Sequence, residues 1–330
     1  MNLTDQTVLI TGGAGFIGSN LVHLLHAQRP DCRLVVLDRL TYAGNPANLE
    51  PWLSSGDVIL ERIDLADQAA VHDCLQKHRP SAVFHLAAES HVDRSISGPR
   101  PFIDSNIIGT YVLLEECRAL WSGQPGRLLH VSTDEVFGSL GDSGAFTEST
   151  PYDPSSPYSA SKAASDHLVR AWNRTFGLDV VLTNCSNNFG PRQYPEKLIP
   201  VIIRNICDHK PLPVYGDGSN VRDWLFVDDH CHALLAAMEC GQTARSYNVG
   251  TRNEWSNLRL VEHLCDRVDA HLGRTDSSRR LITFVTDRPG HDHRYAIDPT
   301  RIHTELGWSP RYAFEEALDL TVQWYLQNAS

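Results

Sequence analysis

Two side chains spaced for acid–base chemistry lie in the segment Pro157-Tyr158-Ser159-Ala160-Ser161-Lys162. On a helix begun after Pro157, Tyr158 and Lys162 share one face, because residues four apart are neighbours on a helix surface. A nearby ammonium favours the phenolate and so lowers the pKa of a tyrosine. Such a tyrosine can accept the proton of an alcohol whose carbon loses hydride, although a Tyr and Lys at this spacing occur by chance in many helices.

A hydroxyl and two carboxylates, Thr133-Asp134-Glu135, directly follow an apolar run at residues 128–132 that predicts a strand. Loss of water beside a newly oxidised carbon needs a base for the C–H and an acid for the departing hydroxyl, and Asp134 and Glu135 could divide these tasks. A charged helix start is the plainer alternative, because a helix dipole favours acids there. Because Tyr158 and Lys162 are also present, the sequence favours the catalytic interpretation of Asp134 and Glu135.

A glycine-rich loop follows the first apolar run, Val8–Ile10, with Gly12, Gly15 and Gly18 spaced as GxxGxxG. Glycines at such a loop allow a tight turn and a close approach of the backbone to a pyrophosphate at a helix N-terminus. The pattern indicates a dinucleotide site, although an ordinary strand-to-helix turn can also carry glycines.

The type of dinucleotide is indicated by Asp38, which ends the second predicted strand 38 − 18 = 20 residues after Gly18. An acid at this spacing accepts the ribose hydroxyls of NAD and repels a ribose phosphate. Arg39 follows directly and could instead accommodate the phosphate of NADP, so the pattern favours NAD and leaves NADP open. Asp64 and the segment 86–88 follow later predicted strands, where the rest of the cofactor would pass.

Short β-branched or apolar runs alternate with segments of helical period in the first half of the chain, which predicts an α/β fold with a Rossmann-type, doubly wound parallel sheet. The predicted strands are Val8–Ile10, Leu34–Leu37, Val58–Leu60, Ala82–Leu86, Leu128–Ser132 and Val180–Thr183. After about residue 186, Pro- and Gly-rich connections and shorter helices, such as Asn257 to Leu272, predict a smaller lobe. We expect residues 1–185 to bind NAD and carry the catalytic residues, and residues 186–330 mainly to bind substrate, with some segments returning to the first domain.

Composition excludes several classes of protein. The net charge of -11 argues against a nucleic-acid partner, which requires clustered Lys and Arg. The start of the chain lacks the pattern of a signal peptide, and no apolar run approaches the roughly 20 residues of a membrane span, so we expect a cytoplasmic protein without membrane contact.

Metal binding is not expected. The eight cysteines fall at scattered spacings, without a zinc or redox motif, which indicates buried free thiols. His230-Cys231-His232 has metal-binding residue types, but alternate residues of a helix point to different sides. We therefore expect helix packing and no metal.

Long motifs carry a more specific signal, because they resemble those of the dTDP-glucose 4,6-dehydratases, a family of extended short-chain dehydrogenase/reductases. The resemblance covers nearly the whole chain and is carried by TGGAGFIGSN, LDRLTYAGN, HLAAESHVDRSI, NIIGTYVLLEE, VSTDEV, SPYSASKAASDHLVRAW, NCSNNFGPRQYPEKLIP, GDGSNVRDWLFVDDH and DRPGHDHRYAID. It implies conversion of dTDP-glucose to dTDP-4-keto-6-deoxyglucose and water in deoxysugar biosynthesis. Carbon 4 is oxidised, water is lost across carbons 5 and 6, and hydride returns to carbon 6, so that NAD is regenerated.

The same resemblance implies a role for each residue of the site. Thr133 would bind the carbon-4 hydroxyl, Glu135 would be the carbon-5 base, Asp134 the acid for the leaving hydroxyl, and Lys162 would bind ribose and tune Tyr158. The implied cofactor-binding residues, besides Tyr158 and Lys162, are Gly12, Gly15, Phe16, Ile17, Gly18, Asp38, Arg39, Leu40, Thr41, Asp64, Leu65, Leu86, Ala87, Ala88, Ser90, Ser105 and Asn188. The implied substrate-binding residues, besides Thr133, are Ser90, Asn187, Lys197, Leu198, Pro213, Val214, Tyr215, Arg222, Asn257, Asp287, Arg288 and His291.

Two departures and two alternatives accompany the resemblance. Phe137 stands where the family usually has tyrosine. The connection from Ser139 to Phe146 is short, and we expect this short connection to reshape the mouth of the site. Another nucleotide-sugar 4,6-dehydratase or a nucleotide-sugar 4-epimerase would share the loop, the Tyr and the Lys, but an epimerase needs no Asp-Glu pair. A silent NAD-binding regulator would be expected to have lost Tyr158, Lys162 or the acids. In the family, helices corresponding to Ile107–Leu120 and Tyr158–Phe176 pair into a four-helix bundle, which implies a homodimer.

Overall fold

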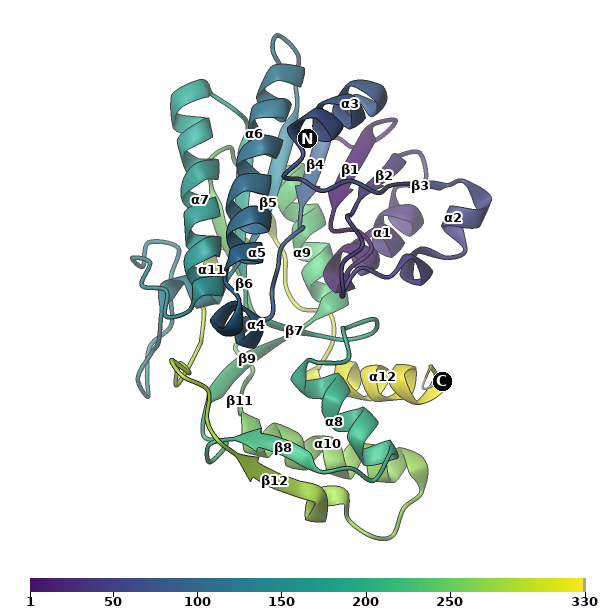
Figure 1. Cartoon of the computed structure of the whole chain (residues 1–330), viewed down its shortest axis with the longest axis vertical. Coiled ribbons are helices and arrows are strands. Elements are labelled where there is room, and N and C mark those ends of the chain that lie inside the picture. The colour runs from purple at the N-terminus through teal and green to yellow at the C-terminus, as the bar shows by residue number, and fades with distance from the viewer. Residues whose placement is uncertain (329–330) are drawn as a thin grey trace.

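The computed structural model describes residues 1–328 and has a larger and a smaller lobe (Figure 1). The larger lobe is built on a seven-stranded sheet in the order β10-β6-β5-β4-β1-β2-β3, with parallel pairing throughout. Its strands are β1 (Thr7–Thr11), β2 (Arg33–Leu37), β3 (Val58–Glu61), β4 (Ala82–His85), β5 (Arg127–Thr133), β6 (Val180–Cys185) and β10 (Ser246–Val249). The predicted Rossmann-type, doubly wound sheet is confirmed.

Helices cover both faces of this sheet, which is why its strands are nearly continuous apolar runs. Successive side chains of β1 alternate between the two faces: Val8 and Ile10 enter one apolar cluster and Leu9 enters another. The first face carries α1 (Phe16–Gln28), α9 (Val227–Cys240) and α11 (Thr300–Leu306). The second carries α3 (Gln68–His78), α6 (Gly109–Leu120) and α7 (Pro157–Phe176).

The smaller lobe packs against the carboxyl edge of the sheet (Figure 1). It contains α8 (Leu198–Cys207), α10 (Asn257–Leu272), α12 (Phe314–Gln327), the parallel pair β8 (Leu212–Tyr215) and β12 (Ile282–Val285), and the three-stranded sheet of β7 (Asn187–Phe189), β9 (Val221–Phe226) and β11 (Glu254–Ser256). The bounds of α10 equal the predicted ones, because the Ser256 side chain caps its first turn and Gly273, in the left-handed conformation, ends it. Ile199 and Leu260 of this lobe belong to the same apolar cluster as Val8, so the core is continuous between the lobes.

Short elements complete the described chain. They are α2 (Trp52–Ser55), α4 (Val92–Ser97), α5 (Arg100–Phe102), a π-helix η2 (Ile103–Ile108), and the 3-10 helices η1 (Pro46–Leu49), η3 (Asp134–Phe137) and η4 (Ser278–Leu281). Of these, η3 and α4 lie next to the carboxyl ends of β5 and β4 and so contribute to the site described below.

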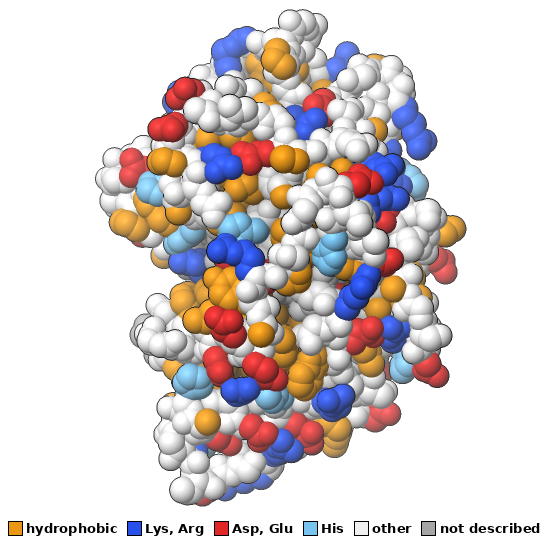
Figure 2. Space-filling model, turned by 180° about the vertical axis from the view of Figure 1, so that it is seen from behind, with side chains coloured by type: hydrophobic (Ala, Val, Ile, Leu, Met, Phe, Trp, Pro, Cys, Tyr) orange, Lys and Arg blue, Asp and Glu red, His pale blue; other side chains and the backbone are white. Residues whose placement is uncertain are grey.

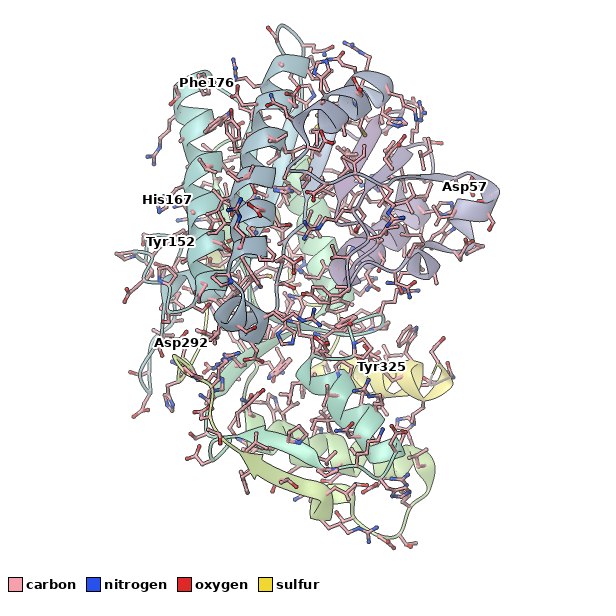
Figure 3. The ribbon with its side chains drawn as sticks, viewed as in Figure 1. Asp57, Tyr152, His167, Phe176, Asp292 and Tyr325 are labelled. Carbon is pink, nitrogen blue, oxygen red and sulfur yellow. The ribbon has the colours of Figure 1, made fainter. Side chains whose placement is uncertain are left out.

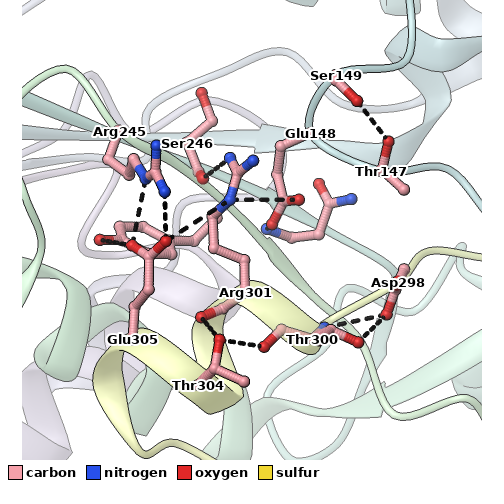
Figure 4. A network of polar contacts seen from close by, with 12 residues as sticks. Thr147, Glu148, Ser149, Arg245, Ser246, Asp298, Thr300, Arg301, Thr304 and Glu305 are labelled. Carbon is pink, nitrogen blue, oxygen red and sulfur yellow. Dashed lines mark hydrogen bonds and ion pairs between the residues drawn. The ribbon is translucent and has the colours of Figure 1, made fainter.

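The outer edge of the large sheet is formed by β10, and a polar network covers it (Figure 4). The backbone N–H of Asn248 donates to Glu148 (3.0 Å), and Arg301 of α11 donates to the carbonyl of Ser246 (2.9 Å). Arg301 also lies 3.7 Å from the carboxylate of Glu148. The network pairs backbone groups that an edge strand would otherwise expose, and it fastens the segment after η3 to the sheet.

The molecular surface carries charges of both signs close together on the face seen in Figure 2. Among residues 1–328, no helix combines the length and the apolar character needed to cross a bilayer.

Candidate active site

A cavity of about 560 Å³ opens between the lobes, at the carboxyl ends of the parallel strands. Ligands of doubly wound folds bind at this edge. All five predicted catalytic residues line the cavity: Thr133, Asp134, Glu135, Tyr158 and Lys162. Every predicted cofactor residue except Leu40 and every predicted substrate residue except Asp287 also lines it.

The two exceptions support residues of the cavity. Leu40 adopts a positive φ of 57° and its N–H donates to the Asp38 carboxylate (2.8 Å). The Asp287 carboxylate lies 2.7 Å from Nδ1 of His291, which does line the cavity.

The glycine loop approaches the next strand end so closely that side chains are excluded. Gly12 has φ +69°, and a Cβ there would lie 2.8 Å from Cα of Ala87. A Cβ on Gly18 would lie 2.2 Å from the carbonyl oxygen of Gly12. The loop therefore needs glycine at these positions for packing between β1 and β4 and to leave its backbone exposed to the cavity.

Asp38 and Arg39 follow β2 at the same edge of the sheet. The N–H groups of Ala14 (3.1 Å) and Leu40 (2.8 Å) hold the Asp38 carboxylate. Burial raises the pKa of Asp38, and the two N–H groups oppose that rise. Arg39 pairs with the carboxylates of Asp64 (3.1 Å) and Glu89 (2.7 Å). Arg39, which the sequence analysis considered as a possible ligand of the NADP phosphate, therefore already pairs with two carboxylates.

The start of α7 positions Tyr158 and Lys162. Pro157 occupies the first turn, and the side chains of Ser156 and Ser159 exchange hydrogen bonds with each other's backbone N–H, a capping box. Tyr158 and Lys162 are therefore one turn apart on the buried face of the helix, as their spacing predicts. The Lys162 ammonium donates to the carbonyl of Val131 in β5 (2.8 Å), which fixes the helix beside that strand.

The phenol of Tyr158 differs from expectation in one respect. Burial, and then the charge of Glu135, raise its pKa well above the usual value, while a hydrogen bond with Thr133 opposes the rise. In the protein chain by itself, burial therefore dominates the pKa of Tyr158, and the tuning of this phenol by Lys162 stays a prediction. Burial likewise lowers the pKa of Lys162.

The two carboxylates at the end of β5 have different environments. Asp134 is 1% exposed, and burial, followed by the charges of Glu135 and Asp223, raises its pKa well above the usual value. Burial also raises the pKa of Glu135, but the positive charges of Arg288, Arg222 and Lys197 oppose it. Asp134 is thus stabilised as a neutral acid, whereas Glu135 faces three cations that favour its ionised form.

These cations come from three segments of the smaller lobe. Arg222 in β9 donates to the carbonyls of Val221 (2.7 Å) and Asp292 (2.9 Å), and its guanidinium lies 4.2 Å from the ring centre of Tyr295. Lys197 donates to the carbonyl of Ser90 (3.0 Å) and so joins the two lobes across the cavity.

Sequence reasoning missed several residues of this region, among them Glu89, Tyr295 and Asp166. Tyr295 lines the cavity although only 2% exposed, and its hydroxyl donates to Asp292. Asp166 lies behind the site and accepts hydrogen bonds from Ser132 and Tyr152 (2.8 Å each). The signal for Asp166 was its position four residues after Lys162, on the same helix face. Figure 3 shows Tyr152 beside α7 and Asp292 at the edge of the smaller lobe.

The two departures from the family pattern lie outside the cavity lining. Phe137 packs in a small apolar cluster, stacked on Phe146 with ring centres 5.2 Å apart. Leu140 and Phe146 form backbone bridges with residues 294 and 297, so the short connection between them is pinned to the segment that carries Tyr295. The expectation that the connection reshapes the mouth of the site finds no support among the residues that line the cavity.

The His230-Cys231-His232 sequence lies on α9, where His230 is buried and its Nδ1 lies 2.8 Å from the amide oxygen of Asn188, a cavity residue. Over residues 1–328, no group of three or more His, Cys, Asp or Glu side chains is arranged to hold a metal ion.

The same chain matches known proteins over almost its entire length. A family model described as GDP-mannose 4,6 dehydratase matches residues 9–321. The dTDP-glucose 4,6-dehydratase of Xanthomonas campestris pv. campestris (strain B100) is 54% identical over 330 residues, covering 98% of this chain and 93% of that protein. The chain belongs to the dTDP-glucose 4,6-dehydratase family.

Solved structures of both dehydratases and epimerases are similar to this fold. The dTDP-glucose 4,6-dehydratase of Streptomyces venezuelae, solved with NAD and dTDP bound, has a TM-score of 0.90 and 44% identity, and the alignment covers 98% of this chain and 97% of that one. The UDP-glucose 4-epimerase of Thermotoga maritima, solved with UDP-glucose, has a TM-score of 0.87 and 27% identity over 98% and 100% of the two chains. Because the fold is common to both reactions, the side chains of the site must distinguish them.

The dehydratase-family cavity has the features that an NAD cofactor requires. A side chain at Gly12 or Gly18 would clash with the backbone of Ala87 or Gly12, so glycine preserves the tight loop whose residues line the cavity where a pyrophosphate would bind. The buried Asp38 carboxylate, held by two N–H groups, is an acceptor for ribose hydroxyls.

Proposed function

We propose that this chain is an NAD-dependent hydro-lyase that converts dTDP-glucose to dTDP-4-keto-6-deoxyglucose and water. The observation that carries the proposal is the pair Asp134 and Glu135, a buried and a partly buried carboxylate in unlike environments, in the same cavity as Tyr158. Oxidation at carbon 4 alone would need no such pair, whereas a 5,6-elimination needs an acid and a base together. Family membership supports the choice of substrate.

Each side chain has a task in this proposal. Bound NAD would supply the hydride acceptor for carbon 4 and the hydride donor for carbon 6. Tyr158 takes the proton of the carbon-4 hydroxyl, to which Thr133 is hydrogen-bonded, and the positive charge of oxidised nicotinamide favours its phenolate. Glu135 removes the proton of carbon 5, and Asp134 gives its proton to the carbon-6 hydroxyl, which leaves as water. As hydride returns to carbon 6, Glu135 returns a proton to carbon 5.

In the same proposal, each lobe mainly binds one of the two ligands. Residues 1–185 bind NAD and carry the catalytic groups, and residues 186–330 mainly bind the nucleotide-sugar. Lys197, Arg222 and Arg288 all line the cavity, and their positive charges are suited to the diphosphate. Tyr215, 41% exposed at the cavity, offers a ring on which the base can stack.

The purified enzyme, incubated with dTDP-glucose and catalytic NAD, should yield a 4-keto-6-deoxy product detectable by mass spectrometry. Glu135→Gln should still reduce NAD in a single turnover but should not introduce solvent deuterium at carbon 5, and Asp134→Asn should slow elimination while sugar still binds. Formation of a carbon-4 epimer alone would favour the epimerase alternative. Turnover of another nucleotide-glucose but not dTDP-glucose would reassign the base.

We also propose that the enzyme is a homodimer, assembled through α6 and α7 as a four-helix bundle. Several large apolar side chains on η2, α6 and α7 are exposed: Ile103 and Ile108 are each 41% exposed, Tyr111 is 40% and Phe176 is 51% exposed. Figure 1 shows α6 and α7 side by side on the outside of the sheet, and Figure 3 shows Phe176 at the far end of α7. A patch of this kind is typical of an interface.

Light scattering tests the dimer. Tyr111→Glu should halve the measured mass, because it places a charge in the apolar patch, whereas the matched control Leu320→Glu, at a 40% exposed position on α12, should not. A monomeric wild-type protein would contradict the proposal.

The proposed location is the cytoplasm. All eight cysteines are free thiols, which fits a reducing compartment. Recovery of the native protein from an oxidising compartment would contradict this location.

A further inference from the structure

The guanidinium of Arg39 lies at the end of the cavity where Asp38 would receive the cofactor's ribose, and it is held from two sides. Asp64, after β3, pairs with one nitrogen (3.1 Å) and Glu89, after β4, pairs with another (2.7 Å). The two partners differ in exposure: the Glu89 side chain is 9% exposed and that of Asp64 is 43% exposed. The less solvated Glu89 contact should therefore be the stronger of the two.

Glu89 itself is fixed by its backbone. Its N–H donates to the side-chain oxygen of Asn106 (2.8 Å), and its carbonyl accepts from the amide of Asn106 (3.0 Å), which also donates to Ser161 in α7 (2.8 Å). The Glu89 carboxylate takes no part in these bonds, so a substitution that removes only its charge leaves this frame intact.

The charges around this end of the cavity do not suit a ribose phosphate. Asp38, Asp64 and Glu89 supply three carboxylates against the one guanidinium of Arg39, and all four residues line the cavity. An arginine directly after the ribose-binding acid is a residue type that accommodates the 2′-phosphate of NADP. Here its donors are engaged by acids, and burial, which lowers the pKa of Arg39, is outweighed by its bonds to Asp64 and Glu89.

We propose that Glu89 is a cofactor-specificity residue, which excludes NADP by holding the Arg39 guanidinium away from the ribose 2′-position. Asp38 then rejects the phosphate by its own charge, and Glu89 keeps the Arg39 guanidinium from pairing with that phosphate. The inference rests on the proposed use of NAD, but it concerns binding and needs no turnover. It predicts that Arg39 becomes a phosphate ligand when Glu89 loses its charge.

The test is a competition between NADPH and NADH for the purified protein, with bound cofactor measured by chromatography after gel filtration and without substrate. Glu89→Gln should raise the NADPH to NADH binding ratio by about tenfold, the effect of one hydrogen bond to a charged group. Asp64→Asn should raise it less, because Glu89 still holds Arg39. The double variant E89Q/R39A should return the ratio to that of R39A alone.

The double variant separates two explanations. If Glu89→Gln acts only by removing repulsion, the gain in NADPH binding persists without Arg39, and the proposal is refuted. An unchanged ratio in Glu89→Gln, or an equal loss of both cofactors, refutes it as well. The outcome is independent of the dehydratase assay, because a protein inactive on dTDP-glucose would still report its cofactor ratio.

Discussion

Replacement of Asp166 by asparagine should destabilise the protein strongly, although the two side chains have nearly the same shape. The carboxylate is completely buried, and one of its oxygens accepts from Ser132 (2.8 Å), Tyr152 (2.8 Å) and, weakly, Asn184 (3.5 Å). The other oxygen lies 3.1 Å from Nε2 of His130. The side chain thus ties α7 to β5 and β6 immediately behind Thr133.

The magnitude follows from these bonds. A hydrogen bond to a charged group contributes about 1.5 to 3 kcal/mol and a neutral one about 1 kcal/mol. Loss of the charge therefore weakens each of the two short hydroxyl bonds by about 1 kcal/mol, and the new amide N–H₂ must replace an acceptor beside His130. We expect a total loss of about 2 to 4 kcal/mol.

Urea denaturation of Asp166→Asn at pH 7, followed by tryptophan fluorescence, measures this loss. Asp73→Asn, an exposed aspartate of α3, is the matched control and should change the free energy of unfolding by less than about 0.5 kcal/mol. A similarly small change in Asp166→Asn would refute the reasoning, because it would mean that the buried carboxylate contributes no more than an amide.

The pH dependence provides an independent check. Burial acts to raise the pKa of Asp166, but the hydrogen bond and charge of His130, with the charge of Lys162, lower it below the usual 3.8. A lowered pKa stabilises the fold above the unfolded-state value, and this contribution disappears as pH falls through the folded-state value. The stability difference between wild type and Asp166→Asn should therefore be complete at pH 7 and should shrink only at pH values below 3.8.

Three further outcomes are expected. Gly12→Ala should abolish retention of bound NAD, measured by chromatography of the released cofactor, whereas Gly56→Ala, where a Cβ meets no atom within 4 Å, should retain it. Phe137→Tyr should leave kcat and KM unchanged, because the ring lies outside the cavity lining, and a large change in either would contradict that placement. The rate of elimination should rise with pH as Glu135 ionises, and this rise should lie above pH 4.5, the ordinary pKa of a glutamate, because burial raises the pKa of Glu135. The rate should fall at higher pH as Asp134 loses its proton, and Asp134→Asn should remove this alkaline decline.

Much of the fold could be predicted from local patterns. The six apolar runs correspond to β1 to β6 within one or two residues, because parallel strands buried on both faces must be apolar throughout. Helix α10 could be bounded from Ser256 and Gly273, since capping depends on residues next to the helix ends. Strand β10 was not predicted, because its short run pairs with β6, about sixty residues earlier in the chain.

The sequence by itself determined the chemical groups of the site: a glycine loop, an acid 20 residues later, a tyrosine and lysine one helical turn apart, and a threonine with two acids after a strand. Each of these depends on spacing within a single element. The tertiary structure alone decided how the groups are charged and which are engaged. Arg39 is paired by acids 25 and 50 residues away, and Glu135 faces cations from three segments of the other lobe. Burial and charge pairing are sums over neighbours in space, so a pattern along the chain cannot contain them.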